Sequence, residues 1–294
     1  MDIDLDAAVA FMTTHARVLD RRRLQFALGH ATADDVLAAL DAYRNPDGGY
    51  GWGLEPDLRS TTSQPVGAMC ALEVLADLPD TTSRRPIELL DWLAAHTFAG
   101  GGVPFALGFP DTEGSAPHWV GADPAVPTLQ MTAQLAAQAH RLARHRADVA
   151  EHPWLAAATG YCLDEIERTE EAPHAYVLMF AMHFLDAAAA RVPRAGQLLE
   201  HLSRFVVRDG PTPVAGGAEG EVLHPLSFAP HADGPARAMF DAATVRAELS
   251  RTAAGQREDG GWTVDFTAFS PAAAIEWRGF ATLQALAALR GASL

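Results

Sequence analysis

Hydrophobic side chains recur along most of the chain at steps of three and four residues, a spacing that places them on one face of an α-helix. From Leu5 the apolar positions are Val9, Met12, Ala16 and Leu19, which predicts a first helix over 5–19. The same spacing is found within 36–43, 66–72, 87–93, 129–139, 155–166 and 177–184. Because strand-like alternation is nearly absent, the pattern predicts an all-α protein.

The predicted helices have recognisable starts. Thr32 stands where an N-cap is expected before the stretch at 36–43. Ser63 and Asp123 are placed to cap the helices that begin near Gln64 and after Pro124. Prolines stand at or just before eight helical runs, where a missing N–H costs nothing: Pro65, Pro86, Pro127, Pro153, Pro173, Pro193, Pro235 and Pro271.

Glycine-rich segments separate the helices, and four of them resemble one another. They are NPDGGYGW at 45–52, AGGGVPF at 99–105, DGPTPVAGG at 209–217 and REDGGW at 257–262. Their spacing leaves room for two helices per unit, which predicts five or six helical hairpins. Since a hairpin cannot bury its apolar stripe alone, we expect the hairpins to stack and close into one α/α toroid over residues 1–294.

A Gly- and Pro-rich segment at 208–235 interrupts this repeat. It contains His224, and His231 follows within the same segment. Ordered loops of this length usually have a function, so it is either a lid over the mouth of the ring or mobile surface.

Composition narrows the function classes. The chain is 49% hydrophobic and 20% charged, typical of a globular protein with a large core. Its net charge of −15 disfavours nucleic acid as a partner, because a phosphate backbone would be repelled. All 22 basic residues are arginines, which excludes a Schiff-base lysine, a phosphate-loop lysine and a Ser-Lys dyad.

The sequence indicates a cytoplasmic protein without a membrane span. Its first residues are acidic and lack the apolar run of a secretory signal. The most apolar stretch, 175–190, is interrupted by His183 and Asp186 and is too short to cross a bilayer. Cys70 and Cys162 lie in apolar helical patterns without a CxxC partner, so we expect two core cysteines, no disulfide and no zinc.

Gln256, Gly260 and Trp262 match the Gln, Gly and Trp of the QW repeat of squalene-hopene and oxidosqualene cyclases. The segment at 47–52, DGGYGW, looks like a second copy without the Gln. The chain therefore resembles the terpene-cyclase and protein-prenyltransferase superfamily along most of its repeat framework. The resemblance implies an α/α toroid around an apolar cavity and an isoprenoid or other apolar substrate.

The catalytic motifs of that superfamily are missing. The nearest string to its DxDD acid motif begins at Asp123 and keeps only this first Asp. Neither Cys70 nor Cys162 has the Asp two residues before it that a zinc prenyltransferase requires. No cofactor is therefore expected, except that Mg²⁺ could accompany a diphosphate substrate through carboxylates.

In a toroid, loops that lead into inner helices line the mouth, where the first free N–H groups of those helices carry a partial positive charge. The richest such loop contains Trp52, Glu55, Asp57 and Arg59. If Asp57 or Glu55 lies against Trp52 away from water, its pKa rises and it can act as a general acid. Alternatively, Arg59 pairs with a carboxylate only to hold the loop.

Two further clusters lie at loop-to-helix junctions. His118, Trp119 and Asp123 form the second, although N-capping explains Asp123 and His118 has no second metal ligand nearby. The third surrounds the last glycine-rich loop, where we expect Asp259 to form the turn and Glu276 to open the final helix. It consists of Asp259, Trp262, Asp265, Glu276, Trp277 and Arg278.

Three functions remain open at this stage: a terpene-cyclase-like enzyme that protonates an apolar substrate, a carbohydrate-active α/α barrel with paired carboxylates across a cavity, and a non-catalytic binding ring. In each case the protein binds a small molecule or, for the ring, a protein partner. The sequence leaves the oligomeric state open. The catalytic candidates are Glu55, Asp57, Asp123 and Glu276. The substrate-binding candidates are Trp52, Arg59, His118, Trp119, Trp262, Trp277 and Arg278.

Overall fold

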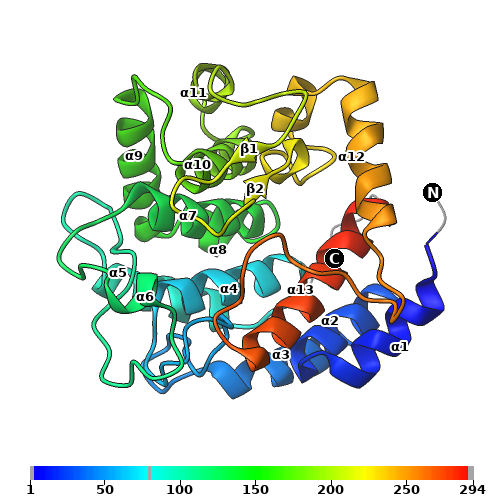
Figure 1. The fold of residues 1–294 in the computed structure, drawn as a ribbon. Helices are drawn as coiled ribbons and strands as arrows, with labels where there is room; N and C mark the ends of the chain where they lie inside the picture. Colours follow the sequence, from blue (N-terminus) through cyan, green and yellow to red (C-terminus); the bar gives the residue numbers. More distant parts are fainter. Residues whose placement is uncertain (1–2, 79–80, 291–294) are drawn as a thin grey trace.

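A computed structural model describes residues 3–78 and 81–290, which fold mainly into helices (Figure 1). The prediction of an all-α protein is confirmed. In the described residues the only strands are β1 (Thr212–Pro213) and β2 (Val222–Leu223), an antiparallel pair. The longer helices are α1 (Leu5–His15), α2 (Val18–Ala27), α3 (Ala33–Leu40), α4 (Pro65–Ala76), α5 (Arg85–Ala95), α7 (Leu129–Ala143), α9 (Pro153–Glu167), α10 (Ala175–Ala188), α11 (Ala195–Ser203), α12 (Ala242–Ala254) and α13 (Pro271–Arg290). The short ones are α6 (Pro117–Val120), α8 (Ala147–Ala150), η1 (Asp41–Tyr43), η2 (Pro225–Ser227) and η3 (Pro235–Met239).

Helix α7 lies at the centre of the packing. It packs against α4 on one side and α10 on the other, so these three helices form one layer. Helices α5, α9 and α11 pack behind them as a second layer. Leu72, Leu135 and Phe184, one from each helix of the first layer, are completely buried. The layers form because each helical hairpin must cover its apolar stripe with its neighbours.

The last helix returns to the first two. Figure 1 shows α13, in red, beside α1 and α2, in blue, and α13 packs against both. The Gln256 side chain accepts the N–H of Asp4 at 2.8 Å and donates to the carbonyl oxygens of Asp4 at 2.7 Å and Gly260 at 3.0 Å. The first and last elements also share a core that includes Phe11 and Trp262.

Three of the four glycine-rich loops have the same backbone hydrogen bonds. In each, the first residue donates to the carbonyl oxygen four residues later, and the N–H three residues later donates back, at 2.8 to 3.1 Å. The first residues are Asn45, Phe98 and Arg257, with partners Gly48 and Gly49, Gly101 and Gly102, and Gly260 and Gly261. The repeat read from the sequence is therefore a repeated three-dimensional turn.

Close packing explains why these turns need glycine. Gly101 has a φ of 91°, and a Cβ there would lie 2.3 Å from the Ala157 carbonyl oxygen in α9. Gly260 has a φ of 89°, and its Cβ would lie 2.2 Å from the Ala7 carbonyl oxygen in α1. Only glycine accepts both conditions. In all three loops the next glycine lies against an aromatic ring, that of Trp92, Tyr161 or Phe11.

The predicted fourth copy, at 209–217, is wrong. Gly216 also has a positive φ, 73°, but faces open space, and Gly217 lies beside Glu221 of its own loop. The pair lies in the connection between β1 and β2, and no helix packs on it.

The segment at 208–235 lies along α10. The His174 ring contacts the Ala215 carbonyl oxygen at 2.9 Å at the start of α10, and the His183 ring contacts the Ser227 carbonyl oxygen at 2.7 Å in its middle. Near the end of α10, Asp186 accepts the N–H of Ala236 at 2.7 Å. The segment is therefore attached over the length of α10.

The C-terminal half of α4 is held by ion pairs. Arg23 of α2 contacts Glu73 at 2.8 Å and Asp77 at 2.9 Å, and Arg141 of α7 contacts Asp77 at 2.8 Å. All four side chains are at most 14% exposed. We call Arg23, Glu73, Asp77 and Arg141 the ionic floor, because they connect α2, α4 and α7 at this end.

Several predicted helix boundaries need correction. The expected helix over 5–19 is two helices, because the backbone turns at Ala16 and Arg17, whose guanidinium donates to the Leu54 carbonyl oxygen at 2.8 Å. The final helix begins at Pro271, so Glu276 lies inside it. The Thr32 cap is confirmed and forms a capping box with Asp35.

The two other predicted caps are wrong. Ser63 donates to Asp47 at 2.7 Å, and α4 begins without a side-chain cap. Asp123 accepts the N–H of Ala125 at 2.8 Å in a turn, whereas Thr128 caps α7. Among the described helices, none has both the length and the hydropathy needed to cross a membrane.

Candidate functional site

The loops that precede α4, α7 and α13 meet at Asp57. The loop before α4 carries Asp57, whose carbonyl oxygen accepts the N–H of Ala116 at 2.7 Å from the loop before α7. Its carboxylate accepts the N–H of Phe269 at 2.8 Å from the loop before α13. We call Glu55, Asp57, Arg59, Glu276 and Trp277 the mouth cluster, and the region around them the mouth, after the toroid mouth at which the sequence led us to expect them.

The carboxylate of Asp57 is fully engaged. One oxygen accepts the Phe269 N–H, and the other accepts the indole Nε1–H of Trp277 at 2.8 Å. The side chain is 5% exposed. Each carboxylate oxygen therefore accepts one N–H from the segment 269–277, so Asp57 anchors its loop to that part of the chain.

Glu55 is the contrasting carboxyl group. It is 6% exposed, and its Oε2 has no hydrogen-bond partner. Burial raises its pKa to about 8, and the charge of Asp57 adds to this, whereas the N–H groups of Asp57 and Leu58 and the charge of Arg17 oppose it. At neutral pH Glu55 therefore carries a proton, as a general acid must.

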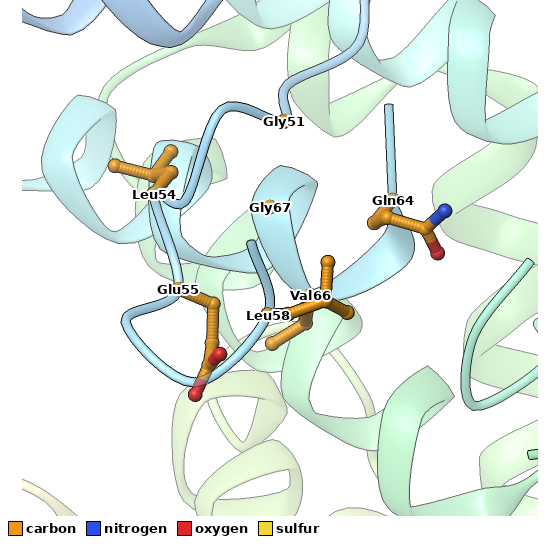
Figure 2. Close-up of a pocket in the computed structure, with 7 residues that line it drawn as sticks. All are labelled: Gly51, Leu54, Glu55, Leu58, Gln64, Val66 and Gly67. Atoms are coloured by element: carbon orange, nitrogen blue, oxygen red, sulfur yellow. The ribbon is translucent and has the colours of Figure 1, made fainter. Parts of the chain in front are cut away.

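Glu55 borders a narrow, largely apolar crevice in front of α4. Figure 2 shows its side chain extending from the loop away from Gly51 and Gln64, with Leu58 and Val66 in the wall. The crevice is too narrow to hold a water molecule. The apolar wall explains the raised pKa, because it offers the carboxylate form no solvation.

Arg59 pairs with Glu276 of α13. The guanidinium contacts the two carboxylate oxygens at 3.2 and 2.9 Å, a two-point geometry. The expectation that Arg59 pairs with a carboxylate to hold the loop is confirmed, but the partner comes from the last helix. Asp57 is not its partner, since both oxygens of Asp57 have other donors.

Trp52 does not shield either carboxyl group as the sequence suggested. Its side chain is 54% exposed, its φ is 58°, and its indole donates to Asn45 at 2.7 Å. The apolar surroundings of Glu55 come instead from aliphatic residues of its own loop and of α4.

The second predicted cluster forms only in part. Trp119 is buried and stacks on Phe105 with ring centroids 4.6 Å apart, and His118 lies next to both rings. Burial lowers the pKa of His118, against the charges of Asp57 and Glu221. Asp123 is occupied by its turn and contributes no contact to this group.

The third predicted cluster divides in two. Trp277 belongs to the mouth cluster, whereas Trp262 donates to the Thr252 carbonyl oxygen at 2.6 Å in the core shared with α1. Arg278 pairs with Asp259 at 2.7 Å and lies over the Phe11 ring at 4.5 Å. Asp259 forms the turn with Gly261 as expected. Trp262 and Arg278 therefore join the two ends of the chain.

One pair near the mouth was missed. The Tyr176 hydroxyl, in the first turn of α10, donates to Glu221 at 2.6 Å. Burial and the charges of Glu221 and Asp265 raise the pKa of Tyr176 well above its ordinary value. A tyrosine just after a helix start was a usable signal, but nothing in the sequence connected it with Glu221.

Within 3–78 and 81–290, no three His, Cys, Asp or Glu side chains are arranged to hold a metal ion. No family model matches this chain, and no curated protein matches it either.

Proposed function

We propose that this protein is an enzyme that protonates an isoprenoid or other unsaturated apolar substrate, with Glu55 as the proton donor. The observation that carries the proposal is a buried carboxyl group with an unpartnered oxygen among aliphatic side chains, where burial raises its pKa to about 8. A protonated acid in apolar surroundings is what transfer of a proton to a carbon-carbon double bond requires.

The aromatic residues around the mouth support an apolar substrate. Trp277 lies edge-on between Phe266 and Phe280, with centroid distances of 5.0 and 5.6 Å. On α10, Tyr176 and Phe180 stack at 6.3 Å and are half-buried. Aromatic faces stabilise positive charge, which a protonated double bond develops.

We also infer that the helices close into a toroid. The packing of α13 on α1 and α2, together with the Gln256 bonds to Asp4, supports closure between the two ends of the chain. Ring closure would direct the starts of α4, α7, α10 and α13 to one face. The resemblance to terpene cyclases stands as part of this proposal, with Glu55 in place of the missing acid motif.

A carbohydrate-active barrel has less support. It needs two free carboxyl groups facing each other across a sugar. Asp57 accepts two N–H groups and Glu276 is bound to Arg59, so neither of these two carboxyl groups is free to face a sugar.

The test is conversion of squalene and of geranylgeraniol in D2O, with products identified by mass spectrometry. We expect one solvent deuteron per product and a loss of rate of about 100- to 10,000-fold in Glu55→Gln, the usual contribution of a general acid. Glu151→Gln, an exposed glutamate at the end of α8, is the matched control and should keep the rate. Conversion without deuterium, or full activity in Glu55→Gln, would refute the proposal; binding without conversion would favour a non-catalytic ring.

A further inference from the structure

Trp277 is the one donor from α13 that reaches the carboxylate beside Glu55. Its Nε1–H binds Asp57 at 2.8 Å, although 220 residues separate the two in the chain. The Phe266 and Phe280 rings pack nearly perpendicular to the indole, at interplanar angles of 88° and 82°, and restrain its plane. Asp57 in turn is two residues from Glu55, and its N–H is among the groups that face the Glu55 carboxyl.

We propose that Trp277 is a positioning residue: by holding the Asp57 carboxylate in place, it keeps the loop of the proton donor Glu55 docked and the Glu55 carboxyl group shielded from water. This inference rests on the proposed function of Glu55. It assigns to the last helix a role in setting the chemistry of the first glycine-rich loop.

The physical reason is that two effects on Glu55 depend on the same contact. The Asp57 charge disfavours a second negative charge nearby, and the docked loop keeps water from Glu55. The opposing charge is Arg17 of α2, which is paired with Asp20, and Cys70 of α4 is the other titratable group near Glu55. On α13 the charge of Glu276 is balanced by Arg59. Removing the Trp277 N–H should release Asp57, admit water and let Glu55 ionise at lower pH.

The experiment is a ¹³C NMR titration of the Glu55 carboxyl in the full chain labelled on glutamate, with the signal assigned by its absence in Glu55→Gln. In the wild type we expect a pKa of about 8. In Trp277→Phe, which keeps an aromatic ring but loses the N–H, the pKa should fall by at least about one pH unit, a tenfold change in proton affinity. Asp57→Asn, of nearly the same shape, should also lower it and serves if Trp277→Phe does not fold.

Trp92→Phe is the matched control. Trp92 also donates its indole N–H to a carboxylate, that of Asp47 at 3.1 Å, but Asp47 is exposed and lies in the turn at 45–49. Its titration should equal the wild type. An unchanged Glu55 pKa in Trp277→Phe would overturn the inference and leave the proposed function standing, whatever Asp57→Asn does, because that variant removes the Asp57 charge directly. A wild-type pKa near 4.5 would overturn both, because Glu55 would then be ionised at neutral pH.

Discussion

Buried carboxyl groups lie near both ends of α4, but only those at one end are paired with cations. At the ionic floor, Glu73 and Asp77 face the guanidinium groups of Arg23 and Arg141 at 2.8 to 2.9 Å. At the mouth, Glu55 faces aliphatic side chains and has a free oxygen. Charge compensation at the floor is what structural burial requires. An uncompensated carboxyl group costs stability, so its presence at the mouth points to a chemical use.

The largest effect should come from breaking the floor. Arg23→Met leaves Glu73 and Asp77 buried with one cation fewer, which we expect to lower the free energy of unfolding by about 3 to 5 kcal/mol in urea titrations. Arg84→Met is the control, because Arg84 is 84% exposed and only 3.9 Å from Glu88. A loss below about 1 kcal/mol for Arg23→Met would mean that the floor is no more than a surface network.

Burial of Glu55 at the mouth should make the free energy of unfolding depend on pH. Glu55 has a folded pKa of about 8 against 4.5 when exposed, so the folded state holds an extra proton between these values. Its contribution is complete below about pH 4.5 and is lost as pH rises through about 8, at up to about 1.4 kcal/mol per pH unit. Glu55→Gln should remove this slope, measured by urea unfolding from pH 5 to 9. Identical slopes in the two proteins would show that Glu55 is not buried as a neutral acid.

The smallest effect should come from Arg59→Gln. The Arg59 and Glu276 side chains are 27% and 21% exposed, so water already screens the pair, and we expect a loss of about 1 kcal/mol or less. Thermal unfolding measures it, with Arg59→Lys as the variant that keeps the charge but not the two-point geometry. A loss as large as that of Arg23→Met would show that ion pairs stabilise both ends of α4 equally.

The sequence predicted the helices well where the apolar period was long. The stretches at 129–139, 155–166 and 177–184 lie in α7, α9 and α10, because their burial follows from their own spacing. It failed at Ala16, where the turn depends on Arg17 reaching Leu54. It also counted 209–217 as a fourth repeat, because a pair of glycines reads the same whether or not a helix packs on it.

The candidate site divides along the same line. The sequence alone showed that Glu55, Asp57 and Arg59 lie in one polar loop before a helix. Two carboxyl groups beside an arginine predicted either a general acid or an ion pair. Tertiary structure decided which residue has which role, because Trp277, Phe269 and Glu276 arrive from the far end of the chain to engage Asp57 and Arg59. Glu55 received no such partner. Protonation depends on what surrounds a group in space, which the local sequence does not specify.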